Sequence, residues 1–160
     1  ELAFINSYIL IQQIRIGADL YYMEDIPDDL EEILVPKLIL QPLIENAIIH
    51  GLSNSCGTIT MKAIRTANVV TISISDNGIG VPAHKLITLR ESLKISKLST
   101  NGTNHGIALP NIHERIQLLF GREYGLNIFS EESKGFTVSM TLPIVLKGDE
   151  IREGSFNSRG

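Results

Sequence analysis

The sequence has little of what would mark a secreted, membrane-spanning or nucleic-acid-binding protein. Its single cysteine, Cys56, excludes an intrachain disulfide and favours a reducing, cytosolic setting. No apolar run approaches the roughly 18 residues that a membrane span needs, and residues 1–3 do not begin a signal peptide. The formal net charge is -4 with both signs interspersed, so no broad basic surface favours nucleic acid or anionic lipid. We therefore expect a chain that is not inserted in a membrane and binds no nucleic acid.

The composition is that of one folded domain. Hydrophobic residues make up 43% of the 160 residues and charged residues 20%, which is ordinary for a soluble globular protein. A chain of this length suits a single core and leaves little room for a second. We therefore expect one domain with one functional site.

Hydrophobic periodicity divides the chain into helices and strands. Leu2, Ile5 and Ile9 recur at helical spacing, and the helix that they predict starts without a cap, so we expect it to continue a longer helix upstream. Alternating segments joined by short turns indicate two antiparallel hairpins. We expect helices at 1–15, 36–50, 82–93 and 106–120, and strands at 19–26, 58–65, 69–76, 124–130 and 136–143.

Two segments lack such periodicity. Residues 96–105 are rich in Ser, Thr, Asn and Gly, which predicts a mobile loop between two helices. Residues 147–160 carry no pattern, so we expect a disordered tail after a domain that spans residues 18–146. Residues 1–17 would then be the end of a helix that leads in from a region outside this sequence.

The helix expected over residues 36–50 carries a polar face. A step of 100° per residue gathers a core-facing apolar stripe of Leu40, Leu43, Ile44, Ala47 and Ile48. Asn46 and His50 lie together on another face, and Glu45 lies further round. Pro42 would release the carbonyl of Leu38 and bend the axis. The polar face is either solvated or a ligand site, because an amide oxygen such as that of Asn46 can complete a magnesium shell with phosphates and water.

The strand expected over residues 69–76 ends in an inward carboxylate. Period-two alternation places Asp76 on the same face as Val70, Ile72 and Ile74. One interpretation is an Asx turn into a hairpin at Asn77, but a helix rather than a strand follows. The other is a binding role, because a buried carboxylate needs a hydrogen-bond donor, and the exocyclic amine of a purine would provide one.

The helix expected over residues 106–120 begins at a glycine loop. His105 and Gly106 precede it, and free backbone N–H groups at a helix N-terminus favour a bound phosphate. Pro110 is tolerated in the first turn, where its missing donor is not needed. An ordinary loop-to-helix junction would look the same, so this segment alone is a weak signal.

In this order, the three segments resemble the N, G1 and G2 boxes of the GHKL ATPases, the group that contains gyrase, Hsp90, MutL and the histidine kinases. Residues 41–51 resemble in particular the N box of the YesM/LytS-type sensor histidine kinases. Residues 13–20, 111–116 and 134–138 match further patterns of that group. The resemblance covers the chain from residue 1 to about residue 143.

The resemblance implies the Bergerat fold, an α/β fold of the α+β two-layer kind in which helices cover one face of a mixed sheet and a lid closes over ATP. By motif match, Asn46 would hold Mg²⁺, Asp76 would receive the adenine amine, and Gly78 and Gly80 would let the backbone pass the base. Glu45 would polarise the attacking group. The other nucleotide contacts would come from His50, Gly106, Ile107, Ala108 and Leu109.

The implied activity is that of a protein histidine kinase, which donates the ATP γ-phosphate to a histidine. No segment like the family's acceptor surrounds His50, His84, His105 or His113, and we expect His84 and His113 to face solvent. The implied partners are therefore the acceptor-histidine helices of the same protein, outside this sequence, and a response regulator. The implied location is the cytoplasmic part of a membrane-bound parent.

Several positions depart from the family pattern. Ile49 stands where many relatives place a lysine, Ala108 replaces the usual second glycine of G2, and Phe136 replaces the threonine that commonly follows Gly135. Pro42 occupies the place of the catalytic glutamate of gyrase-like ATPases, which disfavours vigorous hydrolysis by the isolated domain. A degenerate GHKL nucleotide-binding module without kinase activity is therefore the alternative to the kinase.

Overall fold

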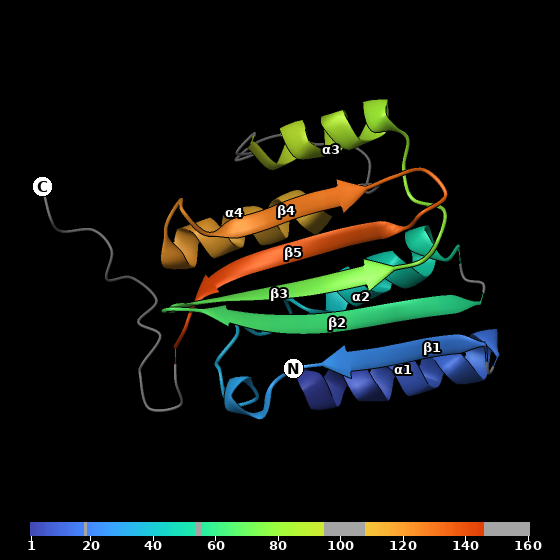
Figure 1. Cartoon of the computed structure of the whole chain (residues 1–160), viewed down its shortest axis with the longest axis horizontal. Coiled ribbons are helices and arrows are strands. Elements are labelled where there is room, and N and C mark those ends of the chain that lie inside the picture. The colour runs from blue at the N-terminus through green and yellow to red at the C-terminus, as the bar shows by residue number, and fades with distance from the viewer. Residues whose placement is uncertain (18, 54–55, 95–107, 146–160) are drawn as a thin grey trace, which may run out of the picture.

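The computed structural model describes residues 1–17, 19–53, 56–94 and 108–145. Within these ranges the chain forms a five-stranded mixed sheet with the strand order β1-β2-β3-β5-β4 (Figure 1). β1 pairs in parallel with β2, and the remaining pairs are antiparallel. The strands are β1 (Leu20–Asp25), β2 (Gly57–Thr66), β3 (Val69–Asp76), β4 (Gly125–Ser130) and β5 (Phe136–Pro143).

Helices pack against one face of this sheet (Figure 1). α2 continues without a break into a π-helical turn, η2, and a short 3-10 turn, η1, follows β1. α3 and α4 pack against each other and against β4. The helical elements are α1 (Leu2–Ile16), η1 (Asp28–Leu30), α2 (Gln41–Asn46), η2 (Ala47–Gly51), α3 (Ala83–Lys94) and α4 (Ala108–Phe120).

The core lies between the sheet and the helices because side chains alternate along each strand. Alternate residues of the central strands are buried, while hydroxyl residues such as Thr71 and Ser73 take the other face. The predicted stripe of α2 and η2 is buried as well, and Ile44 and Ile48 are fully enclosed. The two-layer fold predicted from the sequence is confirmed.

The first helix is tied to the segment that precedes α2. Ile5 and Ile9 of α1 are buried in the core. The Glu1 carboxylate accepts hydrogen bonds from the backbone N–H groups of Leu38 and Leu40, the latter at 3.0 Å. These contacts fix the chain just before α2, the helix that carries Asn46.

The start of α2 differs from the prediction. The helix begins at Gln41 rather than at Pro36, because Leu38 has φ +59 and the chain cannot stay right-handed helical through it. Pro42 therefore lies in the first turn, where no intrahelical donor is lost. The expected release of the Leu38 carbonyl and the bend at Pro42 are wrong.

The other expected helices and strands are found within two residues of their predicted bounds wherever the structure describes them. The predicted loop at 96–105 and the predicted tail at 147–160 lie outside the described residues. Among the described helices, none combines the length and apolarity that crossing a membrane requires.

Candidate functional site

Asp76 is a buried carboxylate at the end of β3. Only 7% of the residue is exposed, so the predicted inward orientation is confirmed. Its Oδ1 accepts a hydrogen bond of 2.9 Å from the Gly78 N–H, so the Asx turn is also present. Burial raises the pKa of Asp76, while the N–H groups of Gly78 and Phe136 oppose that rise by stabilising the charged form. The carboxylate is thus poorly solvated and a strong acceptor for a further donor.

Three glycines let the backbone close around Asp76. A Cβ added at Gly51 would lie 2.4 Å from the Asp76 Cγ, and one at Gly135 would lie 2.0 Å from the Asp76 carbonyl oxygen. A Cβ at Gly78 would lie 1.9 Å from the Gly51 carbonyl oxygen. The end of η2, the loop after β3 and the start of β5 therefore meet at distances that only glycine permits.

The loop after β3 is held from both sides. On one side the Ile79 N–H donates to the Gly51 carbonyl at 3.1 Å, and on the other the Ser133 N–H donates to the Ile79 carbonyl at 2.7 Å. Gly80 has φ +59, and a Cβ there would lie 2.1 Å from the Glu131 carbonyl oxygen. Backbone hydrogen bonds therefore hold this loop in place between η2 and the turn that joins β4 to β5.

The polar residues of α2 and η2 point in different directions: Glu45 faces α1, whereas Asn46 and His50 do not contact that helix through any hydrogen bond among the described residues. Asn46 is half-buried, and its side-chain amide has no hydrogen bond to another described residue. His50 is exposed. The Glu45 carboxylate accepts a hydrogen bond of 2.7 Å from the Gln41 side chain. The pKa of Tyr8 on α1 is raised mainly by burial and, second, by the negative charge of Glu45. Glu45 therefore lies on the side of α2 that faces α1.

The predicted phosphate-binding residues lie at the start of α4. Ala108 is the first residue of the helix, and the Leu109 side chain is buried in the core, so only its backbone could face a ligand. Gly106 and Ile107 lie outside the described residues. Arg115 of α4 donates a hydrogen bond of 2.8 Å to the Lys37 carbonyl, which places α4 beside the segment that leads into α2.

Residues 32–146 match the family of histidine kinase-, DNA gyrase B- and HSP90-like ATPases. The chain belongs to this family. Sensor histidine kinase YesM of Bacillus subtilis (strain 168) is 38% identical over 146 residues, which cover 89% of this chain and 23% of YesM. Sensor protein kinase HptS of Staphylococcus aureus (strain USA300) is 30% identical over 146 residues, which cover 90% of this chain and 27% of HptS. The chain is a GHKL ATPase domain of the sensor histidine kinase type.

Solved histidine kinase structures share the fold of this GHKL domain. The histidine kinase domain of the Erythrobacter litoralis EL346 blue-light activated histidine kinase superposes with a TM-score of 0.57 at 13% identity, covering 89% of this chain and 60% of that chain. The catalytic domain of histidine kinase ThkA superposes with a TM-score of 0.56 at 14% identity, covering 88% of this chain and 92% of that chain. At these identities the likeness shows the fold alone.

Some residues that shape the site of the GHKL domain were not among the predicted site residues. Gly51 and Gly135 belong to segments that match family patterns, 41–51 and 134–138, but their close approach to Asp76 was not predicted. Ser130 at the end of β4 accepts the Val81 N–H at 2.9 Å and donates to the Gly135 carbonyl at 2.7 Å. No local pattern marks a serine that joins two loops far apart in the sequence.

The expected solvent-facing position of His113 is wrong. Its ring is partly buried against β4, and its Nδ1 accepts a hydrogen bond of 2.9 Å from the Leu126 N–H. Gly125 has φ +145, and a Cβ there would lie 2.6 Å from the ring. His113 thus joins α4 to the start of β4, whereas His84 on α3 is exposed as expected.

The burial of His113 predicts a loss of stability in mild acid. Burial lowers the pKa of His113 below its usual value of 6.5. As pH falls below 6.5, the histidine of the unfolded chain therefore binds a proton more readily than the histidine of the folded chain. Protonation also removes the Nδ1 acceptor of the Leu126 N–H. The stabilising contribution is therefore present above pH 6.5 and is lost as pH falls below it.

Denaturant unfolding at pH 7.5 and pH 5.5 would measure this contribution. Relative to the wild type, His113→Gln should lose less stability between the two pH values, because glutamine does not titrate. His84→Gln, which changes an exposed histidine, should keep the wild-type dependence. Equal pH dependence in all three proteins would contradict the role of His113.

Proposed function

We propose that this domain binds magnesium-ATP and donates the γ-phosphate to a histidine outside these 160 residues. The observation that carries the proposal is the buried Asp76 carboxylate between glycine-lined backbone segments. A carboxylate acceptor in a poorly solvated place selects a ligand with a matching donor, because an unmatched ligand leaves the charge without compensation. The exocyclic amine of adenine is such a donor, and the glycines let its flat ring approach the backbone.

The phosphates would lie between α2 and the start of α4. The Asn46 amide oxygen is a hard ligand that no other described residue engages, which suits Mg²⁺ completed by phosphate oxygens and water. Backbone N–H groups in the first turn of α4, at Ala108 and Leu109, would face the phosphates together with Gly106 and Ile107. Bound Mg²⁺ would supply charge neutralisation on the phosphates, while the chain supplies position. His50, exposed at the end of η2, would complete the nucleotide contacts.

The transfer step would form a bond between the γ-phosphorus of ATP and a ring nitrogen of the acceptor histidine. The bond between that phosphorus and the oxygen that bridges it to the β-phosphate would break, and ADP would leave. The acceptor helices and a response regulator are the proposed partners, and a membrane-bound parent is the proposed context, both supported by the similarity to sensor kinases such as YesM and HptS. The chain spans about a quarter of those relatives, so these statements concern the parent protein. The role of Glu45 in polarising the attacking group stays a prediction.

Titration calorimetry with ATP and magnesium tests the binding half of the proposal. The wild-type domain should bind, and Asn46→Ala should weaken binding in the presence of magnesium more than in its absence, because the metal ligand is lost. An absence of binding at millimolar nucleotide with magnesium would refute the proposal.

A transfer assay tests the kinase half. The domain is mixed with the acceptor-histidine helices of its parent and with ATP labelled at the γ-phosphate, and label should appear on the helices. Tight nucleotide binding without any transferred label would show a nucleotide-binding module that has lost catalysis. The two assays together therefore separate a failure of binding from a failure of chemistry.

A further inference from the structure

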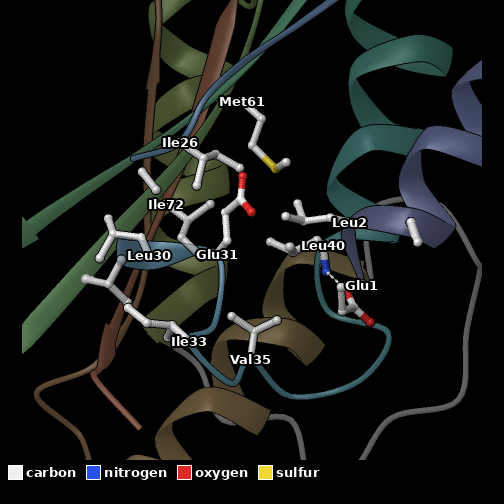
Figure 2. Close-up of a pocket in the computed structure, with 13 residues that line it drawn as sticks. Glu1, Leu2, Ile26, Leu30, Glu31, Ile33, Val35, Leu40, Met61 and Ile72 are labelled. Carbon is white, nitrogen blue, oxygen red and sulfur yellow. Dashed lines mark hydrogen bonds between the residues drawn. The ribbon is translucent and has the colours of Figure 1, made fainter. Parts of the chain in front are cut away.

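A cavity that none of the residues assigned to nucleotide lines lies toward the start of β3, whereas Asp76 is at the end of that strand. It has a volume of about 250 Å³ and opens between the start of α1, η1 and the sheet (Figure 2). Core residues of two central strands form its floor, namely Met61, Ala63, Val70 and Ile72. Folded cores normally hold few voids larger than a water molecule, so an apolar space of this size is a candidate for a bound molecule.

The chemistry of the cavity wall defines what it would accept. Of the thirteen lining residues that the structure describes, eleven are apolar, two are glutamates and none has a cationic side chain. In Figure 2 the Glu31 side chain extends into the cavity beside Ile26 and Ile72. The Glu1 carboxylate at the rim already accepts the backbone N–H groups of Leu38 and Leu40. Glu31 is therefore the carboxylate that a ligand could meet.

We propose that this cavity binds a small amphipathic cation, with its apolar body against Met61 and Ile72 and its ammonium group at Glu31. The apolar floor provides burial for a hydrocarbon chain, and a carboxylate at the edge favours a cation over a neutral or anionic head group. The site is separate from Asp76 and Asn46, so the proposal stands apart from nucleotide binding. Because Glu1 joins α1 to the segment before α2, an occupant would lie against the contact that positions the Asn46 helix.

Methionine methyl NMR of the 160-residue chain can test this directly, with hexylammonium as the probe and hexanol and hexanoate as comparisons. The methionines provide an internal comparison: Met61 lines the cavity, Met23 is exposed on β1, and Met140 does not line the cavity but pairs across the sheet with Ile72, which does. Hexylammonium should shift the Met61 signal saturably, shift the Met140 signal less, and leave the Met23 signal in place. Its affinity should exceed that of hexanol by about threefold, the size expected of a solvent-accessible ion pair.

Two glutamate variants separate the cavity from general surface charge. Glu31→Gln should reduce hexylammonium binding to the level of hexanol, whereas Glu32→Gln, which changes an exposed neighbour outside the cavity, should leave it unchanged. Ala63→Leu should fill the space and remove the Met61 response to all three probes. The proposal is overturned if Met61 does not respond, if hexanoate binds as well as hexylammonium, or if Ala63→Leu responds like the wild type.

Discussion

Gly78→Ala should destabilise the domain by about 3 kcal/mol or more and abolish ATP binding. The added methyl would lie 1.9 Å from the Gly51 carbonyl oxygen and 3.0 Å from the Asp76 Oδ1. Neither neighbour is a flexible side-chain end, since one is backbone and the other accepts the Gly78 N–H. To avoid this clash, the loop after β3 would have to move away from η2. That movement breaks the hydrogen bond from the Ile79 N–H to the Gly51 carbonyl and separates the two backbone segments beside Asp76.

Gly17→Ala is the matched control. Gly17 has φ +115, so alanine there is strained, but an added Cβ would meet nothing within 4 Å. With φ +115 and ψ 172, Gly17 lies in a region that is nearly restricted to glycine, so that variant should lose about 2 kcal/mol from backbone strain alone and should bind ATP like the wild type. Urea unfolding and calorimetry on both variants measure the two effects. A Gly78→Ala protein that is as stable as Gly17→Ala and still binds ATP would show that the close approach is unimportant.

Local sequence patterns were sufficient to predict which side chains face the core, because the period of a strand or helix alone determines this. Alternation along β3 placed Asp76 inward, and helical spacing placed Ile44 and Ile48 in the core. Both rest on the fixed periods of strand and helix, which hold in any fold that has one buried face. The order of the three motif segments then identified the family without any knowledge of their spatial approach.

The start of α2 and the position of His113 could not be predicted this way, because distant residues decide them. The turn at Leu38 is held by Glu1, which is 37 residues away in the sequence. His113 is buried because the start of β4 packs on it, and nothing in its own helix indicates that contact. Gly51 and Gly135 are likewise required only because separate segments meet at Asp76. Sequence thus indicated the family and the elements of the fold, and tertiary packing decided which residues surround Asp76.

Asp76→Asn should weaken ATP binding by about 100-fold while leaving the fold intact, an effect that corresponds to a hydrogen bond to a charged acceptor. Oδ1 of Asp76 accepts the Gly78 N–H, so an asparagine that keeps this bond turns its NH₂ group toward the ligand. Two donors, the asparagine NH₂ and the adenine amine, would then face each other. The domain should stay folded because the neutral amide avoids the cost of burying a charge, which offsets a weakened contact with the Phe136 N–H.

Three measurements distinguish base recognition from general damage. GTP competition should show that the preference for ATP over GTP falls in Asp76→Asn, because the acceptor that selects an amine is gone. Asp25→Asn, at the end of β1 with an exposed carboxylate, should bind ATP like the wild type. Thermal unfolding should show no large loss of stability in either variant. Unchanged base preference in Asp76→Asn would remove the basis for assigning adenine to this site.

The raised pKa of Asp76 adds a pH test of the same assignment. Protonation favours the folded state here, so this group stabilises the domain below the usual pKa of 3.8, and the contribution is lost as pH rises through the raised value. An amine donor stabilises the charged form instead, so ATP and protons should compete. On acidification toward the raised pKa, ATP affinity should therefore fall more steeply for the wild type than for Asp76→Asn, which has no carboxylate to titrate. Parallel affinity curves for the two proteins would place the adenine amine away from Asp76.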